Sequence, residues 1–135
     1  MEKIYERRLS DDYQLGKNDI FVFLSNRKGI HNTGNALIAF QKYGASFKDR
    51  EGLQGNSYAL PLEPKKPYTN LFFTGRLVRC IRQRPFLNFI VPAIGFAGDK
   101  FTDKELIPCF KNTRNLDNLY LPKKYLEVLI KEYWK

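Results

Sequence analysis

Apolar and polar positions along the chain fall into alternating blocks, and these blocks predict strands separated by helices. The run over residues 19–24 is apolar without polar alternation, which is typical of a strand buried on both faces of a parallel sheet. Residues 57–62 and 87–91 are expected to form two further strands, and residues 119–121 a last short one. The chain should therefore fold around a sheet of short strands.

Segments with apolar residues at helical spacing lie between these strands. Residues 35–43 and 69–83 are expected to be helices. Thr102 and Glu105, three residues apart, match a capping box, and the helix that they begin should be shortened or bent at Pro108. Strands that alternate with helices in this order predict an α/β fold.

The predicted helix over residues 69–83 has a basic outer side. Its outer row contains Arg76, Arg79 and Arg82. Its predicted inner face consists of Leu71, Phe72, Leu77, Val78 and Ile81. Because the formal net charge of +9 favours anionic partners, the arginine row has two interpretations, a solvated helix face or a contact surface for RNA or DNA.

The composition predicts a single ordered domain over residues 1–135, with 43% hydrophobic and 15% aromatic residues. No apolar run approaches the ~20 residues that span a bilayer, and the N-terminus has no apolar signal segment. We therefore expect a cytoplasmic protein with no membrane partner. Cys80 and Cys109 stand alone and His31 is the only histidine, so neither a metal site nor a cofactor is expected.

Two glycine-containing loops follow predicted strands and are candidates for phosphate binding. The first is the loop Ser25–Gly34, and the second is Ile94–Gly98. A buried strand that runs into a polar loop and then a helix holds phosphate well, because backbone N–H groups and the helix N-terminus point at the anion. Ligands of open α/β sheets sit outside the carboxyl ends of the strands, so the two loops should converge on one ligand. Neither loop matches the usual nucleotide-binding glycine motifs.

Four motifs follow one another in the chain, within residues 19–110. They are Phe-Leu-Ser-Asn at 23–26 with Gly29, His31 and Gly34 behind it, Lys-Tyr-Gly-Ala at 42–45, Gly-Leu-Gln-Gly-Asn-Ser-Tyr-Ala-Leu-Pro at 52–61, and Ile-Gly-Phe-Ala-Gly at 94–98. In this order the chain resembles macrodomains, most closely a group of small phage-encoded macrodomain-like proteins. The resemblance implies a compact three-layer α/β fold with a mixed sheet flanked by helices. Beyond the matched residues, apolar side chains at helical spacing predict a C-terminal helix at about 123–134.

The resemblance also implies a ligand, ADP-ribose or a related nucleotide-derived molecule, in a cleft between the two loops. One wall of this cleft would consist of Ser25, Asn26, Gly29, His31, Asn32, Thr33 and Gly34. The other wall would consist of Ile94, Gly95, Phe96, Ala97 and Gly98. The residues expected to support the loops are Gln54, Gly55, Asn56 and Ser57, although Gln54 and Asn56 could equally contact the ligand.

Within this cleft, backbone N–H groups would hold the diphosphate and Asn26 the distal ribose. Asn32 and Thr33 stand where viral macrodomains have two glycines, so their side chains would narrow the pocket or redirect the ligand. Phe96 adds an aromatic ring that could stack on a base or ribose, or fill the pocket. A phage protein of this kind would sequester an ADP-ribose-type defence signal in the host cytoplasm, as a binder without turnover.

Two alternatives remain beside this interpretation. The first is an ADP-ribosyl hydrolase in which Asn26 orients the ribose, and His31 or a ligand phosphate activates water. The substitution of both glycines at positions 32 and 33 weighs against it. The second is a basic RNA- or DNA-binding domain, whose affinity would fall steeply with salt.

Overall fold

The computed structural model describes residues 15–26, 29, 34–46, 48–93 and 95–134, and the structural statements below concern these residues. The elements along the chain are β1 (Asp19–Leu24), α1 (Gly34–Lys42), β2 (Gly52–Gln54), β3 (Ser57–Leu60), α2 (Pro67–Gln83), β4 (Asn88–Ile90), α3 (Asp103–Leu106), the 3-10 helix η1 (Ile107–Phe110), β5 (Leu119–Tyr120) and α4 (Lys123–Glu132). The predicted α/β class is confirmed.

The described strands form one mixed sheet in the order β2-β3-β1-β4-β5. The central strand β1 runs parallel to β3 and β4, and β5 runs parallel to β4. Only β2 is antiparallel, and it pairs with β3 at the edge. The sequence pattern does not reveal β2, because three residues are too few to show an alternation. The prediction of a buried parallel strand at β1 is confirmed.

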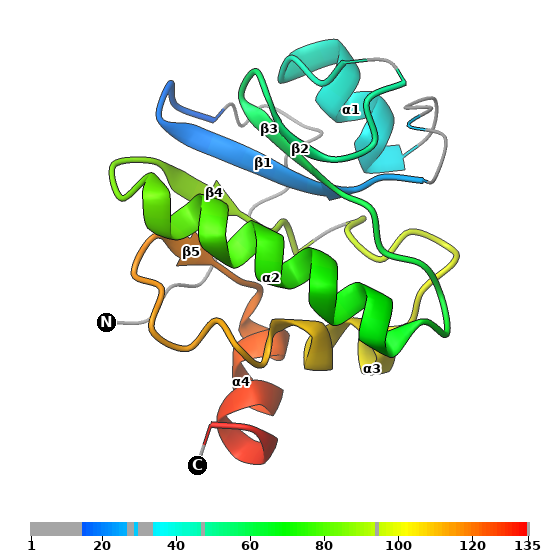
Figure 1. The fold of residues 1–135 in the computed structure, drawn as a ribbon, viewed down its shortest axis with the longest axis vertical. Helices are drawn as coiled ribbons and strands as arrows, with labels where there is room; N and C mark the ends of the chain where they lie inside the picture. The colour runs from blue at the N-terminus through cyan, green and yellow to red at the C-terminus, as the bar shows by residue number, and fades with distance from the viewer. Residues whose placement is uncertain (1–14, 27–28, 30–33, 47, 94, 135) are drawn as a thin grey trace.

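Helices cover both faces of this sheet and give three layers (Figure 1). On one face, Ala39 of α1 and Tyr43, the residue after this helix, pack with Phe21 and Phe23 of β1. The other face carries the larger core cluster, to which α2, α3, η1, α4 and the apolar residues of β1 and β4 on that side contribute. Burial of apolar surface on both sides supplies the main driving force for this arrangement.

Parallel strands β1 and β4 lie side by side, but their outgoing connections cover opposite faces of the sheet. β1 leads into α1 and on to β2 and β3 on one side, whereas β4 leads through α3 to β5 on the other. Neighbouring strands whose connections diverge in this way define the topological switch point of an open sheet. The loops after β1 and β4 therefore leave the sheet at the place where such folds bind ligands.

The start of α3 links two parts of the helical layer. The expected capping box is present, because the Thr102 hydroxyl accepts from the Glu105 N–H at 3.2 Å and the Glu105 carboxylate accepts from the Thr102 N–H at 3.4 Å. The second oxygen of Glu105 accepts from the N–H of Lys65 at 3.0 Å, which ties the segment before α2 to α3. α3 gives way to the 3-10 helix η1 at Ile107–Phe110, as Pro108 predicts.

One expectation about helix α2 needs correction, the inner placement of Phe72, and the inner side of this helix also buries two polar residues. Asn70 and Thr74 are buried although they are polar. The side-chain oxygen of Asn70 accepts from the Glu63 N–H at 2.9 Å, and its side-chain nitrogen donates to the Glu63 carbonyl at 2.8 Å. Phe72 is 61% exposed, and its placement on the inner face was wrong. At about 100° per residue, Phe72 points about 140° away from the fully buried Leu77, five positions on.

Gly44 and Gly55 pack back to back where the β2–β3 turn meets the end of α1, and this contact gives a test of the fold. A Cβ on Gly55 would lie 2.9 Å from the Cα of Gly44, and Gly55 has a φ of 57°. We expect Gly55→Ala to lower the free energy of unfolding by about 3 kcal/mol, because the strain of the left-handed backbone, about 1–2 kcal/mol, adds to a backbone clash.

Gly52→Ala is the matched control, because Gly52 has a φ of 96° but open space beside its Cα. In this variant the free energy of unfolding should fall only by the cost of the strained backbone, about 1–2 kcal/mol. Urea unfolding followed by the fluorescence of Trp134, the single tryptophan, measures both values. Equal losses of unfolding free energy in the two variants would contradict the close packing of Gly55 against Gly44.

Candidate functional site

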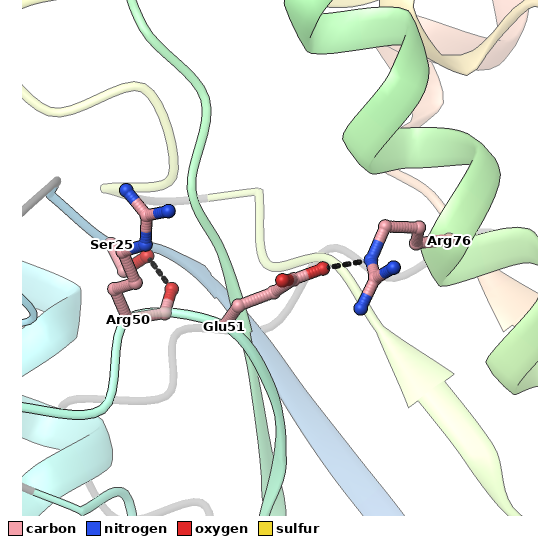
Figure 2. Close-up of polar contacts among 4 residues, drawn as sticks. All are labelled: Ser25, Arg50, Glu51 and Arg76. Atoms are coloured by element: carbon pink, nitrogen blue, oxygen red, sulfur yellow. Dashed lines mark hydrogen bonds and ion pairs between the residues drawn. The ribbon is translucent and has the colours of Figure 1, made fainter.

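The first loop begins at Ser25, whose side chain is tied to a neighbouring segment. Ser25 is buried, and its hydroxyl donates to the Arg50 carbonyl (Figure 2). Its N–H donates to the Leu60 carbonyl at 3.1 Å. Asn26 is exposed, and its carbonyl accepts from the Gly29 N–H at 3.0 Å. The loop thus buries Ser25 as a support and presents Asn26 at the carboxyl end of β1.

Gly29 lies directly against the chain at residues 48–50. It has a φ of 67°, and a Cβ there would lie 2.6 Å from the Lys48 carbonyl carbon. The Lys48 N–H also donates to the Gly29 carbonyl at 2.8 Å. Lys48 and Arg50 are exposed beside this contact, and sequence reasoning missed both. Their basic character is visible in the sequence, but no local pattern connects them with Gly29.

The second loop meets the start of α1. Gly95 has a φ of 79°, and a Cβ there would lie 2.7 Å from the Asn35 side-chain oxygen. Gly34 and Gly98 also have positive φ, 56° and 62°, but a Cβ on either would meet open space. The structure therefore brings the loop after β4 into contact with the end of the loop after β1.

Phe96 belongs to the hydrophobic core. It is 4% exposed, and its ring centroid lies 6.1 Å from that of Phe110 and 6.4 Å from that of Tyr125. The expectation that this ring stacks on a base or ribose is wrong, because the ring is buried in the core beside Phe110 and Tyr125. Ala97, the next residue, is half-buried and packs against the same cluster.

A pocket of about 340 Å³ lies beside the second loop. Residues 95–98 form one side, and the starts of α3 and α4 form the other. The carboxylate of Asp103 is held there by the Lys124 ammonium at 2.8 Å and by the Tyr125 hydroxyl at 3.3 Å. No described residue of the first loop lines this pocket, so it lies next to the switch point and not between the loops.

Gln54 and Ser57 support the structure behind the first loop. Gln54 is buried, its amide nitrogen donates to the Asp49 carbonyl at 2.8 Å, and its amide oxygen accepts from the Ser46 N–H at 2.9 Å. The Ser57 hydroxyl donates to the Gln54 carbonyl at 2.7 Å. Of the two roles considered for Gln54, the hydrogen bonds favour support over ligand contact.

Gly55 and Asn56 complete this supporting group at the β2–β3 turn. Gly55 contacts Gly44 closely. Asn56 has an exposed side chain, while its N–H donates to the Tyr43 carbonyl at 2.8 Å and its carbonyl accepts from the Phe21 N–H at 2.9 Å. The turn is therefore fixed to both α1 and β1.

The charges at the carboxyl end of the sheet favour an anion. Glu51 is paired with Arg76 of α2 (Figure 2), and the exposed residues beside Gly29 are Lys48, Asp49 and Arg50, which together carry one net positive charge. The first turn of α1 contains no acidic residue, so the partial positive charge of this helix end is not neutralised within the turn.

The predictions for His31, Asn32, Thr33 and Ile94 fall outside the described residues and stay predictions. Among the residues that are described, no cluster of three or more His, Cys, Asp or Glu side chains is placed to hold a metal ion. None of the helices in the described ranges combines the length and the apolar character that crossing a membrane requires.

Neither cysteine is poised as a nucleophile. Burial raises the pKa of the Cys109 thiol from its ordinary value of 9.0 to about 11. Burial also raises the pKa of the Cys80 thiol, with Arg84 opposing the shift. Both thiols are therefore protonated at neutral pH, and the thiolate is the reactive form.

Comparison of this chain with protein-family models, with curated proteins and with solved structures finds no match in any of the three. The function must therefore be inferred from the arrangement at the switch point together with the motifs in the sequence.

The raised pKa of Cys109 predicts a loss of stability in alkali. The unfolded chain releases this proton near pH 9 but the folded chain only near pH 11, so the free energy of unfolding should fall as the pH rises through this interval. In Cys109→Ala this alkaline fall in the free energy of unfolding should be smaller by about 1–2 kcal/mol.

Urea unfolding at about pH 8 and about pH 10.5, with a reductant present, measures the difference for each protein. Comparing two pH values within one variant cancels the cavity that alanine leaves. Burial also raises the pKa of Tyr58 and Tyr125, so both proteins should keep a residual fall. An identical fall in wild type and variant would show that Cys109 is not the group responsible.

Proposed function

We propose that this protein binds ADP-ribose or a related nucleotide-derived ligand at the carboxyl ends of β1 and β4. The observation that carries the proposal is the contact between Gly95 and Asn35, which joins the second glycine loop to the start of α1 at the switch point. The exposed glycines Gly95 and Gly98, a first turn of α1 without acidic residues and the exposed Lys48 and Arg50 suit a diphosphate.

In this proposal the ligand lies across the glycines of the second loop. Asn26, exposed at the end of β1, would hold the distal ribose through its amide. The diphosphate would lie near Gly95 and Gly98, where backbone can be approached closely. The far end of the ligand would extend toward the 340 Å³ pocket at the starts of α3 and α4.

The proposed activity is capture without turnover. Covalent catalysis through Cys80 or Cys109 is disfavoured, because burial keeps both thiols protonated. The resemblance to phage-encoded macrodomain-like proteins supports a biological role for such capture. The protein would remove an ADP-ribose-type signal of a defence system from the cytoplasm of the host cell.

Calorimetric titration with ADP-ribose at about 0.15 M salt, where screening suppresses distant charge effects, tests the proposal. We expect a Kd in the micromolar range or tighter, about −8 kcal/mol or better. Gly95→Ala should weaken binding at least tenfold, because its Cβ would displace the Asn35 side chain. Gly16→Ala, in the turn before β1 at the opposite end of the sheet, should bind as wild type does.

Absence of heat and of thermal stabilisation by ADP-ribose would overturn the proposed ligand. Chromatography of the ligand after incubation, using ADP-ribose 1″-phosphate and an ADP-ribosylated protein, decides between capture and turnover. Recovery of both substrates intact supports capture. Product formation that Asn26→Ala abolishes, while binding is kept, would instead establish the hydrolase.

A further inference from the structure

The outer face of α2 combines exposed aromatic rings with exposed positive charge. Tyr68 is 86% exposed and Phe72 is 61% exposed. Residues at steps of three and four share one helix face, so these rings continue into the exposed arginines of the same helix. We call this row the α2 stripe, which consists of Tyr68, Phe72, Arg76, Arg79 and Arg82.

The core does not account for the two rings of the α2 stripe. The inner face of α2 is complete without them, since Leu77 and Ile81 are fully buried in the core cluster. A single exposed apolar side chain is ordinary, but two aromatic rings one turn apart form a patch. The 17 residues of α2 include no Asp or Glu that would oppose an anionic partner.

One ring of the α2 stripe is held in place before any partner arrives. The Arg76 guanidinium lies 5.9 Å from the centroid of the Phe72 ring, and Arg76 is itself paired with Glu51 (Figure 2). Phe73, which packs against the core, meets the Phe72 ring edge-on at 5.3 Å between centroids. A ring restrained in this way loses little side-chain entropy when a flat partner stacks on it.

Gly75 lies within the α2 stripe, between the aromatic and the basic part. It is exposed, and a Cβ there would meet nothing within 4 Å. Glycine weakens a helix interior, and no atom of the residues that the structure describes requires a glycine at this position. The bare backbone at Gly75 leaves a flat place where a partner can approach the helix closely.

We propose that the α2 stripe binds single-stranded nucleic acid. Bases stack on exposed aromatic side chains whatever their sequence, while basic side chains follow the phosphates. The stripe extends about 21 Å along the helix, from Tyr68 to Arg82, which accommodates a few nucleotides. An apolar protein surface would match the rings but would have to desolvate the arginines, whereas a polyanion pairs with them.

Fluorescence anisotropy with a labelled oligothymidine of about twelve nucleotides tests this proposal. We expect binding that weakens with salt, with a slope of log K against log salt of about −1.4 for the two phosphates that Arg79 and Arg82 would neutralise. The double variant Tyr68→Ala/Phe72→Ala should bind at least tenfold more weakly with an unchanged salt slope. The double variant Arg79→Gln/Arg82→Gln should bind more weakly, with a slope smaller in magnitude by about 1.4.

Lys17→Gln/Lys42→Gln is the matched control, because it removes two exposed positive charges before β1 and at the end of α1, away from α2. Its affinity should stay within twofold of wild type. Gly75→Ala adds a second test, since it should raise the thermal midpoint and yet weaken binding at least threefold. Circular dichroism of each variant confirms that the fold is kept.

Several results would overturn the α2 stripe as a nucleic-acid site. One is the absence of binding by the wild type at about 50 mM salt. Another is a loss of affinity in the lysine control equal to that in the arginine variant, which would assign binding to the net charge. A loss confined to the arginine variant would also overturn it, because the rings would then contribute nothing. The affinity of the same variants for ADP-ribose should be unchanged. Failure of the α2 stripe proposal can therefore be distinguished from failure of the proposed ADP-ribose site.

Discussion

The rest of the structure depends on the burial of β1 on both faces. This strand has hydrogen-bonded neighbours on both sides, and each residue from Ile20 to Phe23 is at most 2% exposed. Ile20 and Val22 enter one core cluster, while Phe21 and Phe23 enter the other. Helices must therefore cover both faces, which sends the connections after β1 and β4 in opposite directions. The switch point is a consequence of that requirement.

Close backbone contacts then position the loops around the switch point. Gly29 meets the chain at Lys48, and Gly95 meets the side chain of Asn35, each at a distance that no Cβ would tolerate. Such positions favour glycine because both residues also adopt positive φ. Asn26 is exposed, and the contact with Gly29 sets Lys48 beside the first loop, so the polar edge of the sheet is produced by packing requirements.

Helix α2 connects the core with a separate charged surface. Its inner side packs through Leu77 and Ile81, and Asn70 fixes the preceding segment through two hydrogen bonds to Glu63. Its outer side is free of acidic residues and carries the α2 stripe. A chain with a net charge of +9 thus exposes basic side chains in two separate regions, one beside the first loop and one along α2.

Local pattern in the sequence determined the α/β class, the central strand, the capping box at Thr102 and the break at Pro108, because each depends on residues close together in the chain. It also located both glycine loops. Tertiary structure alone decided which surfaces these residues present. Pairing with β3 creates β2, and packing turns the ring of Phe96 into the core. Contact with Gly29 brings Lys48 and Arg50 to the first loop. These residues lie about twenty positions after Gly29 in the chain, and no local periodicity encodes a contact over that distance.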